Sequence, residues 1–294
     1  LRALGIQDLP GKDFDGIRYV DGDQAATGRF LRGSGRGVRR TTLQRALLDR
    51  AEALGVSLIP RALSDWRQMA DHVEFEGHQA RYMIAADGLH SPIRQALQLG
   101  APAKGPARLG IRRHFSIAPW SDFVEVHWAD DAEAYVTPVG PNEVGVALLY
   151  RQDAQAPGKG DPWQRWIAAF PELASKLSNT TAKTRGAGPF EQRVRSVVSG
   201  RVLLVGDAAG YLDPITGEGI RLGLDTARSA VDAICLDTPR AHIRRCRQVT
   251  WRYWSLTSSL LFLRHRAWMR RRIVPTLRRW PRLFSHILEM LNNA

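Results

Sequence analysis

The stretch that most constrains the fold is residues 200–227, which read GRVLLVGDAAGYLDPITGEGIRLGLDTA. It opens with the short apolar run RVLLV, which is typical of a buried parallel strand, and this run stops at Gly206-Asp207. A loop containing Pro214 follows, and residues 217–219 then lead into a segment whose apolar spacing is helical. A strand, an acidic residue and a glycine-rich helix start, in that order, predict a ligand-binding cradle in an α/β sheet.

The two ends of this stretch suit different parts of one ligand. Ligands of open α/β sheets bind outside the carboxyl ends of the strands, where an ionised Asp207 is an acceptor for sugar or polyol hydroxyls. Gly217 and Gly219 let a ligand approach the free backbone N–H groups at the positive end of the helix dipole. We therefore expect a cofactor site formed by the strand end and the helix start.

A second short motif follows a predicted hairpin over residues 71–86, whose returning strand runs into Asp87-Gly88. Ser91 and Pro92 can begin a helix. The backbone donors of that helix, together with the guanidinium group of Arg94, suit a pyrophosphate. The motif is therefore a second candidate for cofactor binding.

Length and composition indicate a folded soluble protein. A chain of 294 residues can form one large or two moderate domains, and 44% hydrophobic and 24% charged residues are ordinary for such a protein. Cys235 and Cys246 do not have the spacing of a disulfide framework or a metal site, and no metal is expected. The apolar stretches of the sequence are far shorter than the ~20 residues of a membrane span.

The net charge of +13 is concentrated near the C-terminus. Residues 239–288 contain thirteen arginines and no lysine or acidic residue, whereas the rest of the chain carries 29 basic and 29 acidic residues. This distribution argues against a nucleic-acid-binding protein. Arginine with tryptophan and leucine at helical spacing fits two interpretations, a helix on an anionic membrane surface or a helical cap on the protein's own sheet. Pro275 and Pro281 are expected to divide this tail into short helices.

The strings GD-AAG-YLDP-ITGEGI and DG-x-x-S-x-x-R resemble the flavin-binding motifs of FAD-dependent aromatic hydroxylases (group A flavoprotein monooxygenases) and of geranylgeranyl-reductase-like oxidoreductases. The resemblance implies that Asp207 holds the ribityl chain of FAD and that residues 217–220 face the pyrimidine edge of the flavin. The pattern R-x-x-L-x-x-x-L from Arg40 also resembles the family, in which this arginine lies beside FAD. The predicted cofactor-binding residues are Arg40, Asp87, Gly88, Arg94, Gly206, Asp207, Ala208, Pro214, Gly217, Glu218, Gly219 and Ile220.

One part of the family pattern is missing. The GxGxxG fingerprint and the acidic residue that follows it are not found in this sequence. The glycine cluster at residues 33–37 has the wrong spacing and is predicted to be a turn. We therefore expect a family member that lacks its N-terminal FAD-binding unit, and that as given binds FAD poorly.

The expected fold class is mixed α/β, with a Rossmann-like FAD-binding domain, an antiparallel-sheet substrate domain and a helical C-terminal tail. Alternation predicts strands over residues 111–115, 123–128, 134–138 and 144–150, and helical spacing predicts one helix over residues 162–177. The expected parts are residues 1–102 and 191–236 for the FAD-binding domain, 103–190 for the substrate domain and 237–294 for the basic tail.

The resemblance implies an FAD-dependent oxidoreductase, and the preferred interpretation is an NAD(P)H-dependent monooxygenase. Such an enzyme hydroxylates a small aromatic or hydrophobic substrate through a flavin C4a-hydroperoxide. The first alternative is a reductase of C=C bonds in a lipophilic substrate, favoured by Gly210, where many hydroxylases have histidine. The second is a truncated, non-catalytic remnant that binds partners or membrane through its basic tail. Halogenation is disfavoured because the sequence has no W-x-W-x-I-P motif.

The catalytic residues stay unassigned. His114, His127 and Tyr135 are able to orient or deprotonate a substrate, but each is more often an ordinary sheet residue. The expected partner is an aromatic or lipophilic small molecule and not a nucleic acid. We expect a cytoplasmic protein. Peripheral contact of the arginine-rich tail with the inner face of the membrane is left open. The oligomeric state is also left open.

Overall fold

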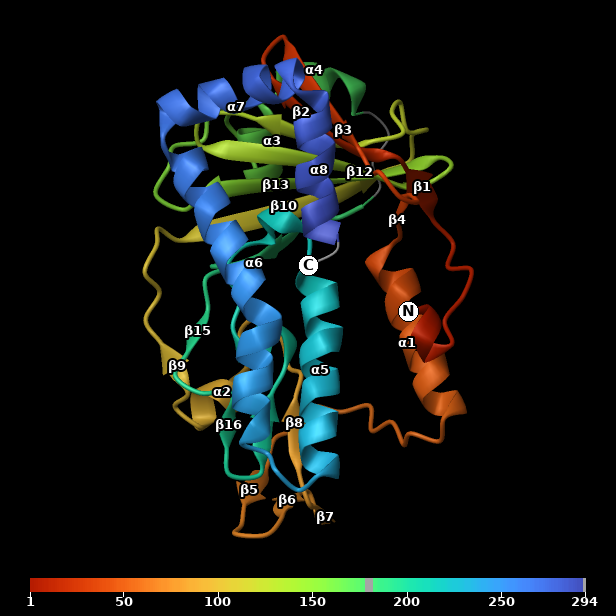
Figure 1. The fold of residues 1–294 in the computed structure, drawn as a ribbon, viewed down its shortest axis with the longest axis vertical. Helices are drawn as coiled ribbons and strands as arrows, with labels where there is room; N and C mark the ends of the chain where they lie inside the picture. The colour runs from red at the N-terminus through yellow and green to blue at the C-terminus, as the bar shows by residue number, and fades with distance from the viewer. Residues whose placement is uncertain (178–181, 293–294) are drawn as a thin grey trace. The chain divides into compact units, whose positions relative to one another are not determined.

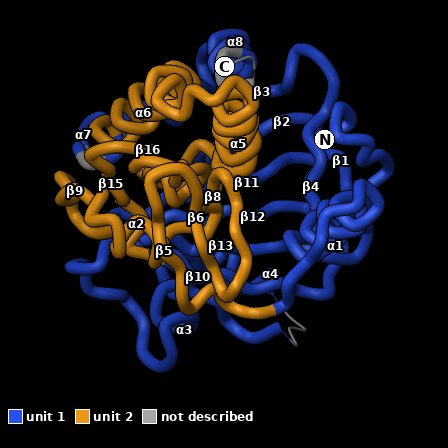
Figure 2. Tube along the Cα trace, turned by 90° about the horizontal axis from the view of Figure 1, so that it is seen from below, with its two compact units in different colours: residues 1–60, 109–187, 264–294 blue, residues 61–108, 188–263 orange. Residues whose placement is uncertain are grey.

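The structure is a computed structural model that describes residues 1–177 and 182–292. The chain forms two compact units, each assembled from separate segments (Figures 1 and 2). Unit 1 comprises residues 1–60, 109–187 and 264–294, and unit 2 comprises residues 61–108 and 188–263. The expected mixture of helices and sheets is confirmed. The division into domains at residues 102, 190 and 236 stays a prediction.

Unit 1 is built on a seven-stranded sheet with the strand order β14-β10-β13-β12-β11-β2-β3. Its strands are β2 (Gly16–Asp21), β3 (Gln24–Arg29), β10 (Arg108–Phe115), β11 (Val124–Trp128), β12 (Ala132–Gly140), β13 (Glu143–Arg151) and β14 (Arg185–Ala187). Strands β10 to β13 confirm those predicted from alternation. The sheet is mixed rather than antiparallel, because β2 pairs in parallel with β11.

The first face of this sheet is covered by two short helices, α3 (Pro162–Ile167) and α4 (Pro171–Lys176). Trp163, Trp166 and Phe170 are buried there against the alternate small and branched side chains of β12 and β13. The aromatic residues of this region are therefore part of a hydrophobic core. Each such ring removes a large apolar area from water, which makes this cluster a main source of stability for unit 1.

The single helix predicted over residues 162–177 is wrong. The chain leaves helical geometry at Phe170, where φ is −132°. Pro171 has no N–H group and cannot continue the preceding helix, so it begins α4 instead. The start of α3 follows the expected chemistry, because Asp161 and Gln164 form a capping box.

The opposite face of the sheet, at β2 and β3, is covered by α7 (Ala267–Arg279) and α8 (Pro281–Asn292), as Figure 1 shows. Val274, Leu277, Phe284 and Leu288 form a buried cluster with the side chains of these strands. The helices approach the sheet closely, because a Cβ atom added at Gly28 would lie 2.8 Å from both Phe284 and Leu288. The last helices of the chain thus cover their own sheet, which supports the cap interpretation of the tail.

The predicted role of Pro275 is wrong, because this proline stands inside α7. A proline in a helix interior costs about 3 kcal/mol, and here the burial of Val274 and Leu277 on either side of it offsets that cost. The tail is instead divided into helices at Arg266, where the backbone is extended and α7 is about to begin, and at Trp280, where α7 ends. Pro281 begins α8, as expected of a proline at a first helical position.

Unit 2 contains a three-stranded sheet of the order β16-β17-β8, formed by β16 (Val198–Ser199), β17 (Val202–Leu204) and β8 (Met83–Ala85). The parallel strand predicted in the RVLLV run is confirmed as β17, which pairs in parallel with β8. The helices α5 (Gly219–Cys235) and α6 (Ala241–His265) follow β17 in the chain. The break predicted between them at residues 237–239 is also confirmed.

The predicted hairpin over residues 71–86 is confirmed only in its first part. β6 (Val73–Phe75) and β7 (His78–Ala80) form the hairpin, with β5 (Trp66–Gln68) as a third strand, whereas the continuation β8 joins the other sheet. The remaining elements are β1 (Lys12–Phe14), β4 (Gly35–Gly37), α1 (Arg40–Ala53), α2 (Pro92–Ala96), β9 (Gly100–Ala101) and β15 (Arg193–Val194). Since β4 pairs with β1, the turn predicted at residues 33–37 is wrong for Gly35–Gly37.

In the part of the chain that the structure describes, no helix combines the length and the hydrophobicity that crossing a bilayer requires.

Candidate functional site

Unit 2 brings the two motifs of the sequence to one edge of its sheet. β8 and β17 run in parallel with Ala85 opposite Leu204, so the residues that follow each strand emerge at the same edge. Asp87 follows β8 and Gly206-Asp207 follows β17. All three residues of β17 are fully buried, which holds this edge in place. The arrangement is the one in which α/β proteins bind their ligands.

Arg94 ties the two motifs together. Its side chain is buried and its guanidinium group donates hydrogen bonds to the carbonyl oxygens of Asp207 (3.2 Å) and Ala208 (3.0 Å) on one side. On the other side it donates to the carbonyl oxygen of Leu89 (2.6 Å) and to Oε1 of Gln192 (2.8 Å). Through these bonds Arg94 positions the backbone of both motifs. Burial lowers the pKa of Arg94. Its contact with a pyrophosphate stays a prediction.

Asp87 and Ser91 organise the turn before α2. Oδ2 of Asp87 accepts a hydrogen bond from the backbone N–H of Ile93 (3.1 Å), and Oγ of the fully buried Ser91 accepts one from Arg94 (2.9 Å). Gly88 adopts a φ of +83°, which a residue with a Cβ rarely adopts. Part of the motif is therefore explained by local structure, since its carboxylate and hydroxyl groups cap a helix.

The turn after β17 places Asp207 beside the start of α5. Gly206 has a φ of +56°, and its N–H donates to Oγ1 of Thr226 on α5 (2.9 Å). The chain then forms a short 3₁₀ turn in which Ala208 is completely buried and Asp207 is half-buried. A partly shielded carboxylate at a strand end is an acceptor suited to ligand hydroxyls.

The loop between Asp207 and α5 is held by residues that the motif did not predict. The hydroxyl of the buried Tyr253 on α6 accepts hydrogen bonds from the N–H groups of Leu212 (3.1 Å) and Asp213 (3.0 Å) and donates to the carbonyl oxygen of Asp213 (2.9 Å). Burial raises the pKa of Tyr253, so the hydroxyl stays protonated. Asp213 also pairs with Arg108 at 2.8 Å, with both side chains buried. These contacts hold the loop between Asp207 and α5 in the conformation seen in the structure.

The start of α5 has the features expected of a site that a bound group completes. Its N-cap residue is Glu218, and no side chain caps the helix, which Gly217 enters with a φ of +72°. Oε1 of Glu218 accepts from Arg221 (2.6 Å), but the buried atoms Oε2 of Glu218 and Oγ1 of Thr216 have no hydrogen-bond partner among the residues that the structure describes. Buried polar atoms without partners are rare and indicate a missing ligand or water. The residues present here thus fit a polar, hydrogen-bonding cofactor.

The remaining predicted site residues lie as follows. Pro214 begins a short 3₁₀ turn capped by Asp213, and Gly219 and Ile220 form the first turn of α5 with Ile220 exposed. Arg40 is the first residue of α1 and belongs to unit 1, where its side chain is exposed. Its neighbour Arg39 forms an ion pair with Glu143. The contact of Arg40 with FAD stays a prediction.

Two of the three side chains considered for catalysis lie in hydrogen-bond networks of unit 1. Nε2 of His127 is 3.1 Å from Oε2 of the buried Glu125, and the hydroxyl of Tyr135 donates to Glu133 (3.3 Å). His114 is half-buried, and burial with the nearby Arg39 lowers its pKa, so it is neutral at physiological pH. This geometry does not assign a catalytic role to any of them.

The sequence matches known flavoproteins. Residues 38–235 match the family described as FAD binding domain. A protein of Rhodococcus erythropolis, AqdB1, named for a 2-heptyl-3-hydroxy-4(1H)-quinolone synthase activity, is 33% identical over 195 residues, 62% of this chain and 50% of its own. A menaquinone reductase of Mycobacterium tuberculosis is 26% identical over 52% of this chain and 41% of its own. A ubiquinone hydroxylase of Rhodospirillum rubrum, UbiL, is 25% identical over 76% and 57%. The chain thus spans about half the length of these curated relatives.

Solved structures share the fold. The Diels-Alderase PyrE3 superimposes with a TM-score of 0.73 at 18% identity, over 95% of this chain and 66% of that chain. The flavin-dependent brominase Bmp2 superimposes with a TM-score of 0.70 at 15% identity, over 99% and 86%. The resemblance inferred from the motifs is confirmed by these matches. Because the matched family covers well over half of the sequence, the chain belongs to the FAD binding domain family.

Proposed function

We propose that the protein is an FAD-dependent oxidoreductase and that unit 2 holds the cofactor at the edge formed by β8, β17 and the start of α5. The observation that carries this proposal is the junction made by Arg94, which fixes the backbone of both motifs through three hydrogen bonds and donates a fourth to the side chain of Gln192. Membership of the FAD binding domain family supports it. Bound FAD supplies the redox chemistry, and the chain binds it, orients it and limits access of water.

Individual residues have distinct tasks in this proposal. The half-buried carboxylate of Asp207 accepts hydrogen bonds from the ribityl hydroxyls. The uncapped N-terminus of α5, with Gly217 and Gly219 at its start, favours acceptor atoms and negative charge at the pyrimidine edge of the flavin. Oγ1 of Thr216 and Oε2 of Glu218 lie buried at the same helix start and gain the partner they lack. Tyr253 keeps the connecting loop in one conformation.

We further propose that the reaction is an NAD(P)H-dependent hydroxylation of an aromatic or quinone-like ring that carries a lipophilic chain. The relatives named for a quinolone synthase and a ubiquinone hydroxylase support this class. The relative named as a menaquinone reductase supports the second candidate, a reductase acting on a lipophilic substrate. Both candidates share the cofactor site, and they differ in whether oxygen is consumed.

The cofactor assignment is tested by titrating FAD fluorescence with the complete wild-type protein and with its variants Asp207→Ala and Asp87→Ala. We expect Asp207→Ala to weaken FAD binding by about 1.5–3 kcal/mol, because a charge-assisted hydrogen bond is lost. Asp87→Ala should have a smaller effect, since that carboxylate accepts from the backbone of α2. Equal affinities for all three proteins would exclude the proposed site.

The reaction class is tested by following NADH and NADPH oxidation by the FAD-loaded protein with menadione as a quinone probe, in air and under argon. A hydroxylase should consume oxygen together with the reduced nicotinamide, and its substrate turnover should stop under argon. Turnover that continues under argon would favour the reductase candidate. Flavin reduction by neither nicotinamide would contradict both.

A further inference from the structure

The outer face of α7 and α8 carries a dense positive charge. Residues 267–288 contain no acidic residue, and the exposed arginines of this segment are Arg271, Arg272, Arg278, Arg279 and Arg282. None of these five forms an ion pair with a residue that the structure describes. The inner face of the same helices is occupied by the buried cluster on β2 and β3. Packing of the tail on its own sheet therefore explains the apolar residues but not the arginines.

Large apolar side chains stand among these arginines. Trp268 and Trp280 are each 59% exposed and Leu283 is 49% exposed. Trp268, Arg272 and Arg279 recur at helical spacing on the face of α7 opposite to Val274 and Leu277, and the Arg272 guanidinium lies 5.8 Å from the Trp268 ring centroid. Exposed tryptophan and leucine beside arginine are the composition of helices that lie in a membrane interface.

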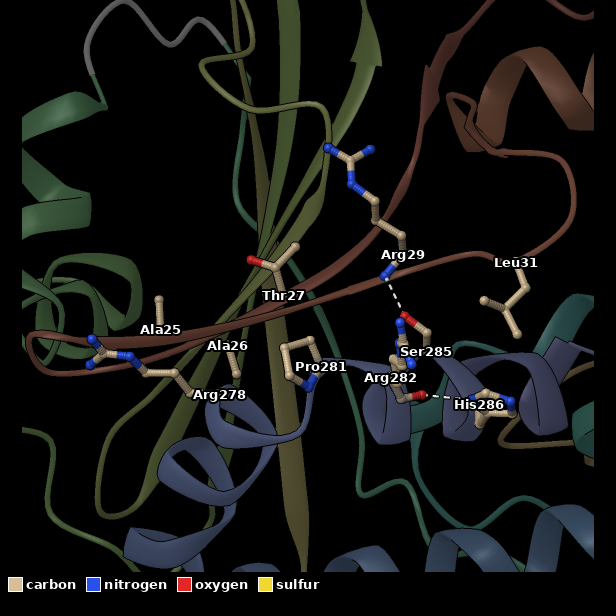
Figure 3. A pocket seen from close by; sticks show the side chains of 10 residues that line it. All are labelled: Ala25, Ala26, Thr27, Arg29, Leu31, Arg278, Pro281, Arg282, Ser285 and His286. Atoms are coloured by element: carbon tan, nitrogen blue, oxygen red, sulfur yellow. Dashed lines mark hydrogen bonds between the residues drawn. The ribbon is translucent and has the colours of Figure 1, made fainter.

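A groove opens at the junction of the two helices, between β3 and Pro281 (Figure 3). It has a volume of about 420 Å³, and its walls include the small side chains Ala25 and Ala26 on β3 and the exposed Arg278 and Arg282 on the helices. Arg29, which also lines it, is paired with Asp15 at 2.6 Å. Arg278 and Arg282 at this groove form no ion pair within residues 1–177 and 182–292, and the chemistry that complements them is a phosphate group attached to an apolar chain.

We infer that the outer face of α7 and α8 binds the surface of an anionic lipid bilayer. Trp268, Trp280 and Leu283 enter the headgroup region, and the groove beside Arg278 and Arg282 takes the phosphate of one lipid. A nucleic acid would satisfy the arginines but would leave Leu283 and the apolar wall of the groove without a complementary partner. The inference is independent of the redox reaction proposed above, because it concerns only unit 1.

The contribution of the arginines to bilayer binding is tested by sedimenting the full chain with phosphatidylcholine vesicles that either contain or lack phosphatidylglycerol. We expect the double variant Arg278→Ser/Arg282→Ser to lower the partition coefficient on anionic vesicles roughly 25-fold, which is about 1 kcal/mol for each arginine. The matched control is Arg2→Ser/Arg185→Ser, which removes two exposed arginines elsewhere in unit 1 and should change the coefficient less than about twofold. Equal losses in the two double variants would overturn the assignment of this face.

The insertion part is tested with an environment-sensitive thiol label in a Cys235→Ser background. A label at Leu283→Cys should shift to shorter emission wavelengths with anionic vesicles, whereas a label at the 65% exposed Leu54→Cys should not. This measurement keeps all arginines, so it decides the inference even if the double variant folds poorly. A shift at Leu54 only, or tighter binding to duplex DNA than to the vesicles at the same salt concentration, would contradict it.

Discussion

At the scale of single residues, Arg94 shows how one buried cation can connect two motifs that are far apart in the chain. Arg94 belongs to the motif that begins at Asp87. Two of its hydrogen bonds nevertheless end on the backbone of the other motif, at Asp207 and Ala208, which are 113 and 114 residues away. Its planar fork of donors reaches four acceptors at once, which the single ammonium group of a lysine cannot do. Arg94 therefore holds the backbone of Asp207 in place through the carbonyl oxygen.

We predict that Arg94→Lys lowers the free energy of unfolding by about 2–4 kcal/mol, because it leaves buried carbonyl oxygens without donors while keeping the charge. Urea denaturation followed by circular dichroism measures this change. Arg81→Lys, at an exposed arginine of the same unit, is the control and should unfold like the wild type. An unchanged midpoint for Arg94→Lys would show that the fork geometry does not matter.

The sequence predicted the local structure of the motifs, whereas the list of cofactor-binding residues stays a prediction. The GD motif correctly predicted a strand shortly before Gly206-Asp207 and a helix that begins near Gly219, since strand and helix starts depend on neighbouring residues. The direction in which Arg94 points depends on carbonyl groups far away in the chain. Tyr253 was missed for the same reason, because it lies in a tail whose most obvious feature is charge.

At the scale of elements, the packing of α8 on β3 depends on the absence of a side chain. Gly28 lies directly beneath Phe284 and Leu288, and any Cβ atom there would be closer to both than real contacts allow. The backbone of Gly28 does not require glycine for its φ angle, so the constraint comes from the helix above it. Close packing of this kind leaves little space for an added methyl group.

We predict that Gly28→Ala lowers the free energy of unfolding by about 1–3 kcal/mol, because α8 must move away from the sheet. Gly100→Ala is the matched control, since Gly100 also lies in a strand but has nothing within 4 Å of its added Cβ. Thermal unfolding of both variants by calorimetry gives the comparison. A loss of stability in both, or in neither, would mean that the helix does not press on the strand at Gly28.

Elements with strong alternation were predictable, whereas elements defined by their neighbours were not. β10 to β13 alternate in the sequence, but β2 and β3 contain glycine and polar residues and become strands by pairing with β11 and with each other. Pro275 shows the reverse case, in which a residue that usually ends a helix is overridden by burial of the turns around it. In both cases tertiary contacts outweigh local preference.

At the scale of the whole molecule, each unit is assembled from segments that are far apart in the chain. His242 illustrates the contacts that unite unit 2, because its fully buried ring bridges α6, α5 and β17. Its Nδ1 is 2.9 Å from Oγ of Ser229 and its Nε2 is 2.9 Å from the carbonyl oxygen of Leu204. Burial lowers the pKa of His242.

We predict that this histidine makes the protein less stable in mild acid. A folded pKa below the ordinary 6.5 means that the unfolded chain takes up the proton first, so stability is complete above about pH 6.5 and falls as the pH decreases from there. His114, whose pKa is also lowered, acts in the same direction, and the exposed His72, whose pKa is raised by Asp71 and Glu74, acts in the opposite one.

Urea unfolding at several pH values between about 5 and 7 measures this dependence. His242→Gln should remove up to about 1.4 kcal/mol per pH unit from the slope of unfolding free energy against pH. His72→Gln, which removes the histidine whose pKa is raised by Asp71 and Glu74, should change the slope in the opposite direction. A slope that is the same in wild type and His242→Gln would show that His242 is not the group that takes up the proton.

The division into two units was not predictable from composition or motifs. The sequence predicted one domain from residues 1–102 and 191–236, one from residues 103–190 and a separate tail, a division that stays a prediction. By contacts, residues 1–60 belong with residues 109–187, and segments of the tail belong to both units. Only contacts between distant residues define such units, and no local pattern records them. The family resemblance was predictable because its motifs are short and contiguous.

The late position of α8 also affects how the chain is made. During synthesis, β2 and β3 leave the ribosome long before residues 281–292, so Ala26 and its neighbours on that face of the sheet stay open to water and to other chains until α8 has been made. Contacts of such large sequence separation slow folding and prolong the exposure of apolar strands. This face of the sheet is therefore the part of the nascent chain most open to wrong association, and the synthesis of α8 ends that exposure.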